Sequence, residues 1–326
     1  MTSLLPRTAL TSLVALGLMA GSALAQDYPT QPINVVVPFS AGGPTDTVAR
    51  LVAQAMSEDL GQQVLIQNVG GAGGTLGAGQ VAVAPNDGYT LLLHHIGMST
   101  APSLYADLPF DPIEDFEPIG LITEVPMTLV ARADFEPESL EDLVTYIQEN
   151  GENVIYGNAG IGAASQLCGL LLQDALGVRM TEVPYQGTGP AMTDLLGGQI
   201  DMMCDQTTNT TTQILAGEIK AYAVTSPERL DNLPDVPTTD EGGLPLQVGI
   251  WHGLYAPAGT DPAIIERLTA SLQVALANET VATRFAELGT VPVTQGQATP
   301  EALAETLSSQ IELWGEVIAA AGVAPQ

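Results

Sequence analysis

Three segments of the chain repeat one order of features: a β-rich run, a glycine-rich turn and the start of an amphipathic helix. In the first unit, strand 33–37 and turn 38–44 precede apolar residues spaced i, i+3, i+4, i+7 and i+8 from Val48. In the second, strand 64–69 precedes a glycine-rich turn and a helix over 75–84. In the third, strand 154–156 leads through turn 157–162 into a helix that ends at Gly177. These units predict an α/β fold of doubly wound, mostly parallel sheets. Ligands of such sheets bind beyond the carboxyl ends of the strands.

Strand and helix signals continue through most of the chain. Residues 89–94 read as a third strand, and we expect Thr45 or Asp46 to be the N-cap of the first helix. A second set of units begins at the capping residue Ser139 and contains strands near 154–156, 200–204 and 221–225. Helices starting at Pro262 and at Pro300, the second capped by Thr299, complete the chain. The pattern predicts two sheets but does not fix where the chain crosses between them.

The first 25 residues have the composition of a signal peptide. Arg7 precedes an apolar run over 9–21, and Ala23 and Ala25 are small residues at the positions that signal peptidase reads. The run is too short to span about 30 Å of hydrocarbon. We therefore expect export to the periplasm with cleavage after Ala25. The residue after the cleavage site is Gln26, whereas a lipid-anchored form would have Cys at this position.

The chain is strongly acidic, with 37 Asp and Glu against 8 Lys and Arg. This balance argues against nucleic acid or an anionic membrane surface as partner. No segment after residue 25 is apolar enough to predict a transmembrane helix, so we expect no direct membrane insertion. The basic residues after the leader are at 50, 132, 179, 220, 229, 267 and 284.

Cysteine and histidine are scarce, which limits the possible chemistry. In an oxidising compartment, Cys168 and Cys204 predict one disulfide, and two buried free thiols are the alternative. Histidines occur at 94, 95 and 252. His94 and His95 should point to opposite faces of a strand, so at most one faces a given cleft. His95 is a candidate donor to a ligand, with a structural role as the alternative. We expect no metal site.

Three strand-to-helix turns have the composition of anion sites: residues 39–46, 70–75 and 157–162. Glycine allows close backbone approach, and a helix start offers unpaired N–H groups at the positive end of its dipole. None of the basic residues lies in these turns. An anion would therefore be held by backbone amides and hydroxyls, unless the glycines only make tight turns.

The sequence gives little support to dinucleotide binding or to hydrolytic catalysis. The stretch Gly71-Ala72-Gly73 approximates a dinucleotide fingerprint, but Leu76 occupies the third glycine position. No GxSxG or HExxH is present. We expect neither a cofactor nor an enzymatic activity. Asp205 follows a strand, where it could pair with a ligand's ammonium group or act as a helix N-cap.

Several stretches together resemble the substrate-binding receptors of tripartite tricarboxylate transporters, often called the Bug family. They span the chain after the leader and comprise residues 28–33, 37–46, 71–74, 85–92, 183–187, 194–201 and 256–260. Residues 94–98, Cys168 and 204–210 look most like the branch that binds acidic amino acids, aspartate in particular.

The resemblance implies a two-domain flytrap of the type II periplasmic-binding-protein fold. Domain 1 would combine 26–124 with 250–326, and domain 2 would be 125–249. The binding residues implied by position, with His95 and Asp205 added from the chemistry above, are Phe39, Ala41, Gly42, Gly43, Thr45, Asp46, Gly73, Thr75, Asn158, Gly162 and Ala163. Many relatives have Ser where this chain has Ala163, so a hydroxyl contact is lost there or supplied by Ser165.

The leading hypothesis is a monomeric periplasmic receptor that delivers a small carboxylate, with aspartate or a C4 dicarboxylate favoured, to membrane permease subunits. A ligand-dependent sensor partner of a two-component kinase is an alternative that the sequence does not separate from transport. An exported enzyme is a third alternative, which lacks an activated nucleophile or metal site.

Overall fold

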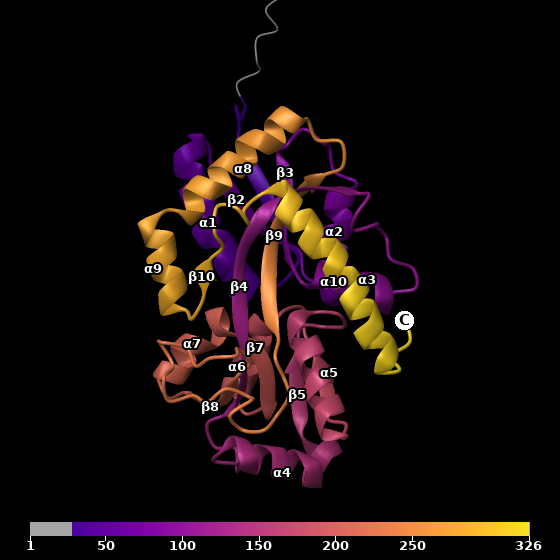
Figure 1. The fold of residues 1–326 in the computed structure, drawn as a ribbon, viewed down its shortest axis with the longest axis vertical. Coiled ribbons are helices and arrows are strands. Elements are labelled where there is room, and N and C mark those ends of the chain that lie inside the picture. The colour runs from indigo at the N-terminus through magenta and orange to yellow at the C-terminus, as the bar shows by residue number, and fades with distance from the viewer. Residues whose placement is uncertain (1–27, 326) are drawn as a thin grey trace, which may run out of the picture.

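The longest strand, β4 (Phe116–Arg132), passes from the upper to the lower part of the molecule (Figure 1). Up to Pro126 it pairs with β9 (Gly249–Pro257), and from Met127 onward with β7 (Met202–Gln206) and β8 (Ile219–Val224). The computed structural model describes residues 28–325, and the expected signal peptide lies outside them. We call the part around β1–β3 and β9 the upper lobe and the part around β5–β8 the lower lobe.

In the upper lobe, the hydrogen-bonded order is β2–β1–β3–β9–β4. Strand β1 (Ile33–Val37) runs parallel to β2 (Val64–Asn68) and β3 (Thr90–His95), and every β1 side chain except Asn34 is buried. The short strand β10 (Val291–Pro292) pairs with β4. The helical segments are α1 (Pro44–Leu60), η1 (Ala72–Gly74), α2 (Thr75–Ala82), α3 (Gly97–Leu104), α8 (Pro262–Leu276), α9 (Glu279–Glu287) and α10 (Pro300–Ala320).

In the lower lobe, β5 (Ile155–Asn158) lies between β6 (Thr181–Pro184) and β7 and runs parallel to both. Its helical segments are α4 (Leu140–Asn150), η2 (Gly151–Asn153), α5 (Ala164–Leu176), α6 (Thr188–Leu196) and α7 (Thr207–Leu215). A disulfide joins Cys168 on α5 to Cys204 on β7, with 6.0 Å between their Cα atoms.

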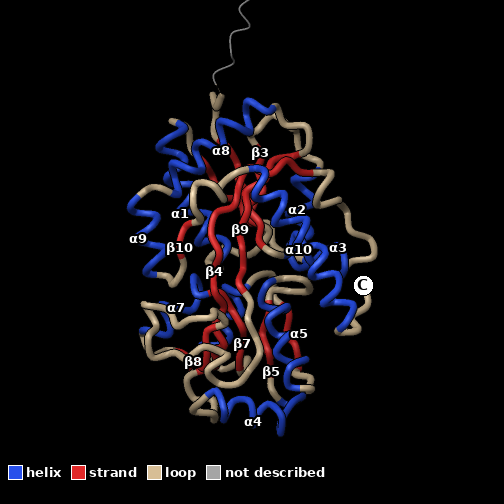
Figure 2. The backbone as a smooth tube through the Cα atoms, viewed as in Figure 1, coloured by secondary structure: helices blue, strands red, loops and turns tan. Residues whose placement is uncertain are grey.

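The two-domain α/β fold agrees with the prediction, but the expectation of mostly parallel sheets is wrong. The strands form one continuous hydrogen-bonded path, visible as the red tube that links both lobes in Figure 2. Strand β9 is antiparallel to β3 and β4, and β4 is antiparallel to β7 and β8. The sheet is mixed because the long strands that cross between the lobes run against their neighbours.

The start of α1 also differs from the prediction. Its N-cap is Gly43, followed by Pro44 in the first turn, rather than Thr45 or Asp46. Proline suits this position because its fixed φ matches the helix and its missing N–H has no intrahelical partner there. The caps Ser139 and Thr299 are where local sequence placed them, and each accepts from the backbone N–H three residues on.

No helix among residues 28–325 combines the length and the apolar composition that a membrane span requires.

Candidate functional site

A small cavity lies where the two lobes meet. The upper lobe contributes Phe39, Pro44, Thr45 and His95, and the lower lobe contributes Ala159, Ala164, Ser165, Thr188, Asp205 and Gln206. The cavity volume is about 10 Å³, which is about the space one water molecule needs. A small organic molecule is larger than this, so the lobes must separate to admit one.

Four helices begin at this cavity. Helices α1, α5, α6 and α7 each contribute an N-cap or first-turn residue to its lining, and none of the four has a side chain that caps its N-terminus. By contrast, α4, α8, α9 and α10 begin away from the cavity, and each has a capping side chain. Helices α2 and α3 also lack a capping side chain, but their first residues do not line the cavity. The uncapped starts leave N–H groups for a guest anion. Each stabilises an anion by roughly 0.3–2 kcal/mol.

Asp46 shapes the first loop rather than lining the cavity. Its carboxylate accepts hydrogen bonds from the Gly42 N–H, from Arg50 Nε and from Asn68 Nδ2, each at 2.9 Å. Burial by itself would raise the pKa of Asp46, but these hydrogen bonds, with the nearby Arg50 charge, hold that pKa below its ordinary value. An ionised Asp46 therefore fixes the backbone that ends at the start of α1.

The histidines lie closer together than predicted. The ring centroids of His94 and His95 are 4.9 Å apart, because β3 ends at His95 and the chain turns there, so the opposite-face expectation is wrong. Only His95 lines the cavity, stacked on Phe39 at 4.6 Å. Burial lowers the pKa of His95 to about 3, which keeps its ring neutral. Its Nδ1 accepts from the Gly97 N–H, so the proton is on Nε2 and available for donation.

Asp205 is the carboxylate in the cavity lining. It lies within β7 just before α7, whose N-cap is Gln206, so the N-cap alternative for Asp205 is wrong. Its side chain accepts from Asn209 Nδ2. Burial raises the pKa of Asp205 to about 6, while hydrogen bonds from Asn209 and the Gln206 backbone, together with the nearby Thr188 side chain, oppose that rise. At neutral pH it is a buried carboxylate without a cationic partner.

The loop between β5 and α5 is held by its own polar groups. Asn158 accepts from the Gly160 N–H and donates to Glu182, so it supports the loop instead of lining the cavity. Ser165 Oγ accepts from the Ala159 N–H at 2.9 Å, and both residues line the cavity. A hydroxyl is therefore present beside Ala163, which is the buried N-cap of α5.

Hydrogen bonds join the two lobes around the cavity. The Ser40 N–H and hydroxyl donate to the Gln186 carbonyl, both at 2.9 Å. Thr100 Oγ1 donates to the Gly162 carbonyl at 2.8 Å, and the Tyr105 hydroxyl donates to the Ile161 carbonyl at 2.9 Å. In each contact the donor is in the upper lobe and the acceptor is backbone of the lower lobe. The structure is thus a closed arrangement of the lobes.

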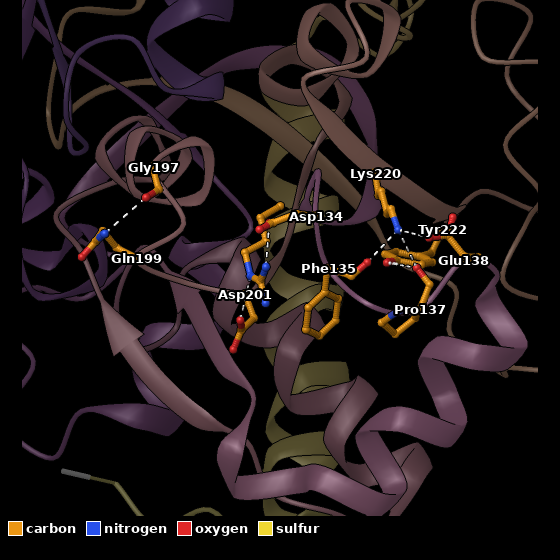
Figure 3. Close-up of polar contacts among 10 residues, drawn as sticks. Asp134, Phe135, Pro137, Glu138, Gly197, Gln199, Asp201, Lys220 and Tyr222 are labelled. Carbon is orange, nitrogen blue, oxygen red and sulfur yellow. Dashed lines mark hydrogen bonds and ion pairs between the residues drawn. The ribbon is translucent and has the colours of Figure 1, made fainter.

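Six of the seven Lys and Arg among residues 28–325 form ion pairs away from the cavity. In Figure 3, Lys220 donates to the carbonyls of Phe135 and Pro137 and to Glu138, while Asp134 and Asp201 are the partners of Arg132. The remaining ion pairs of the described residues are Arg50–Asp46, Arg229–Glu241, Arg267–Asp59 and Arg284–Glu287. No Lys or Arg among residues 28–325 lines the cavity.

The structure divides the predicted site residues into two groups. Phe39, Thr45, His95 and Asp205 line the cavity. The others surround it: Ala41 and Gly42 lie on an outer groove with Tyr185 and Gly189, Gly43 begins α1, Gly73 faces Ile161, Thr75 donates to the Ala72 carbonyl, and Gly162 accepts from Thr100.

The starts of α6 and α7 were not among the candidate anion sites predicted from the sequence. Thr188 and Gln206 line the cavity, as do Pro44, Ala159 and Ala164. The signal for α6 was present, because Gly187 and Gly189 flank Thr188 directly after a strand, as in the three turns that were recognised. Among the described residues, no group of three or more His, Cys, Asp or Glu is placed to hold a metal ion.

Known proteins provide an independent comparison. The chain is 58% identical over 302 residues to the "UPF0065 protein in the TAR-I ttuE-ttuC' intergenic region" of Agrobacterium vitis, covering 92% of this chain and 87% of that protein. It is 34% identical over 310 residues to the "Protein BugT" of Bordetella pertussis, covering 93% of each.

Solved structures agree in fold. The "periplasmic binding protein BugD" superposes with a TM-score of 0.90 at 52% identity, covering 92% of this chain and 100% of that one. "MatC from Rhodopseudomonas palustris with bound malate" gives 0.86 at 43% identity, covering 89% and 100%. A profile described as "Tripartite tricarboxylate transporter family receptor" matches residues 48–323. The chain therefore belongs to this family of periplasmic solute-binding receptors, which bind small carboxylates and are not enzymes.

Proposed function

We propose that this protein captures an acidic amino acid, with aspartate as the leading candidate, or a similar C4 dicarboxylate, and delivers it to the membrane subunits of a tripartite transporter. The observation that carries the proposal is the convergence of four uncapped helix starts on a cavity whose lining has no Lys or Arg. Backbone dipoles and hydroxyls would hold the carboxylates there.

Asp205 is the reason to favour an amino acid. A buried carboxylate repels a second anion, whereas an ammonium group would pair with it and offset the cost of its burial. The neutral His95 ring would donate from Nε2 to a ligand carboxylate without adding charge. The ligands named for two similar structures, malate and adipate, are also small dicarboxylates.

The delivery mechanism we propose is closure of two domains, 26–124 with 250–326 and 125–249. The chain crosses between the lobes along β4 and at the start of β9, so two strand segments would act as the hinge. Ligand contacts with both lobes would favour the closed state, whose surface the permease would recognise. We further propose that the receptor acts as a monomer, after export and cleavage following Ala25.

A thermal-shift screen of the purified protein tests the ligand class. Aspartate, glutamate, succinate, malate and citrate would be compared with lysine and glucose as controls. At 100 times its dissociation constant a true ligand adds about 2.7 kcal/mol to the stability of the folded state. We expect aspartate or a C4 dicarboxylate to raise the melting temperature and the controls to leave it unchanged. A shift with lysine or glucose, and none with any acid, would overturn the proposal.

A further inference from the structure

The start of α6 has a polar group without a partner. Thr188 is the first residue of α6, it is 4% exposed, and its Oγ1 makes no hydrogen bond although it is fully buried. The preceding Gly187 has a φ of +153° and provides no capping side chain. The Thr188 hydroxyl is therefore available at the cavity, at the start of a helix that no side chain caps. Burying such groups unpaired costs free energy that a ligand would recover.

The start of α6 also faces the start of α1. A Cβ added at Gly43 would lie 3.5 Å from the Gly189 nitrogen and 4.0 Å from the Thr188 nitrogen. Closure therefore brings together the positive ends of two helices from opposite lobes. An anion bound between them would be stabilised by both dipoles and would remove their mutual repulsion.

Thr188 and Asp205 line the same cavity, with a hydroxyl donor near a carboxylate acceptor. An α-amino acid has its carboxylate and its ammonium group on one carbon, so the two groups need a donor and an acceptor side by side. A plain dicarboxylate has no such pair of opposite charges.

We propose that the Thr188 hydroxyl and the start of α6 bind the α-carboxylate of an α-amino acid whose ammonium group pairs with Asp205. The side-chain carboxylate of an acidic amino acid then lies toward Thr45 and His95 of the upper lobe. This assignment depends on the proposed function. It adds the orientation of the ligand in the cavity and names Thr188 as the residue that binds its α-carboxylate.

Calorimetric titration of the wild type and three variants with L-aspartate tests the assignment. Thr188→Val removes the hydroxyl at nearly constant volume and should weaken L-aspartate binding roughly 10- to 100-fold. Thr188→Ser, which keeps the hydroxyl, should restore most of the affinity. Thr193→Val, a matched change at an exposed position of the same helix, should leave it unchanged. If Thr188→Val does not fold, Thr188→Ala replaces it.

β-Alanine, which is aspartate without its α-carboxylate, separates this role from a structural one. In the wild type it should bind more weakly than L-aspartate, and Thr188→Val should not weaken it further. Equal losses for both ligands, or full L-aspartate affinity in Thr188→Val, would overturn the assignment. A wild type that binds malate but not L-aspartate would overturn it while leaving the carboxylate receptor intact. A wild type that binds no acid at all would instead refute the proposed function.

Discussion

Asp205 shows how one residue can oppose folding and favour binding. Its burial raises its pKa to about 6, above the ordinary value of 3.8, because the ionised form loses its hydration. The same carboxylate is the acceptor that a ligand's ammonium group would need. Removing this one carboxylate should therefore raise the stability of the protein and lower its selectivity for an amino acid.

The pH dependence of stability should report the cost of burying Asp205. Because its pKa is raised on folding, the folded state binds more protons than the unfolded state between about pH 4 and pH 6. The contribution of Asp205 to the free energy of unfolding should thus fall as pH rises through this window, by about 3 kcal/mol in all and by about 2 kcal/mol between pH 4.5 and pH 7.5. Asp205→Asn should remove that fall. Urea unfolding of both proteins without ligand at pH 4.5 and pH 7.5 measures it, and identical pH profiles would contradict the interpretation.

Ligand selectivity should change when the same carboxylate is removed. Asp205→Ala should weaken L-aspartate binding far more than succinate binding, since only aspartate has the ammonium group, and the difference should be at least tenfold. Asp235→Ala, an equal change of charge at an exposed site in the lower lobe, is the control. Calorimetric titration gives both affinities, and equal losses for the two ligands would eliminate the pairing role.

At the scale of elements, the loop before α2 permits the lobes to approach each other. Gly73 has a φ of +62°, and a Cβ there would lie 1.8 Å from the Ile161 carbonyl oxygen of the lower lobe. Only a residue without a side chain allows this contact. The role that the structure gives Gly73 is thus close approach between lobes.

Gly73→Ala should block closure and weaken ligand binding by at least tenfold. The added Cβ would lie much closer to the Ile161 backbone than real Cβ atoms lie to other atoms. Because the lobes meet here through backbone rather than through flexible side chains, neither can move away without a large cost in free energy. Gly61→Ala is a matched control, because Gly61 has a similar φ of +67° but no atom within 4 Å of its added Cβ. Both variants have the same backbone strain. Calorimetry should show lost affinity only for Gly73→Ala, and equal behaviour of the two would refute the steric explanation.

At the scale of the whole molecule, the disulfide ties the lower lobe together beside the cavity. Cys168 and Cys204 are both fully buried, and they link α5 to β7, the elements that contribute Ser165 and Asp205 to the cavity lining. The bond closes a loop with a sequence separation of 36. Its stabilising effect should act mainly on the unfolded chain, through the loss of conformational freedom.

The double variant Cys168→Ala/Cys204→Ala should have a free energy of unfolding lower by about 4 kcal/mol, the value expected for a loop of this length. Urea unfolding under oxidising conditions provides the comparison with the wild type. Adding a reductant should lower the wild-type midpoint and leave that of the double variant unaltered. A wild-type midpoint that does not respond to the reductant, with thiols shown to be free, would contradict the prediction.

The sequence by itself determined the features that depend on neighbouring residues. Strand β1, the caps Ser139 and Thr299 and the glycine-rich turns were predictable, because their hydrogen bonds and patterns span only a few positions. Family membership followed from motifs spread over the whole chain. The N-cap of α1 was the local exception. The preference for polar caps predicted Thr45 or Asp46, but Asp46 is already hydrogen-bonded to Gly42 and Arg50.

Only the tertiary structure decided which helix starts share a cavity. Ser40 contacts Gln186 across 146 positions, and this contact sets the start of α6 against that of α1. The antiparallel course of β4 and β9, the unpartnered Thr188 hydroxyl and the burial of Asp205 likewise arise from contacts between distant segments. Their physical cause is packing between lobes, which no local periodicity encodes.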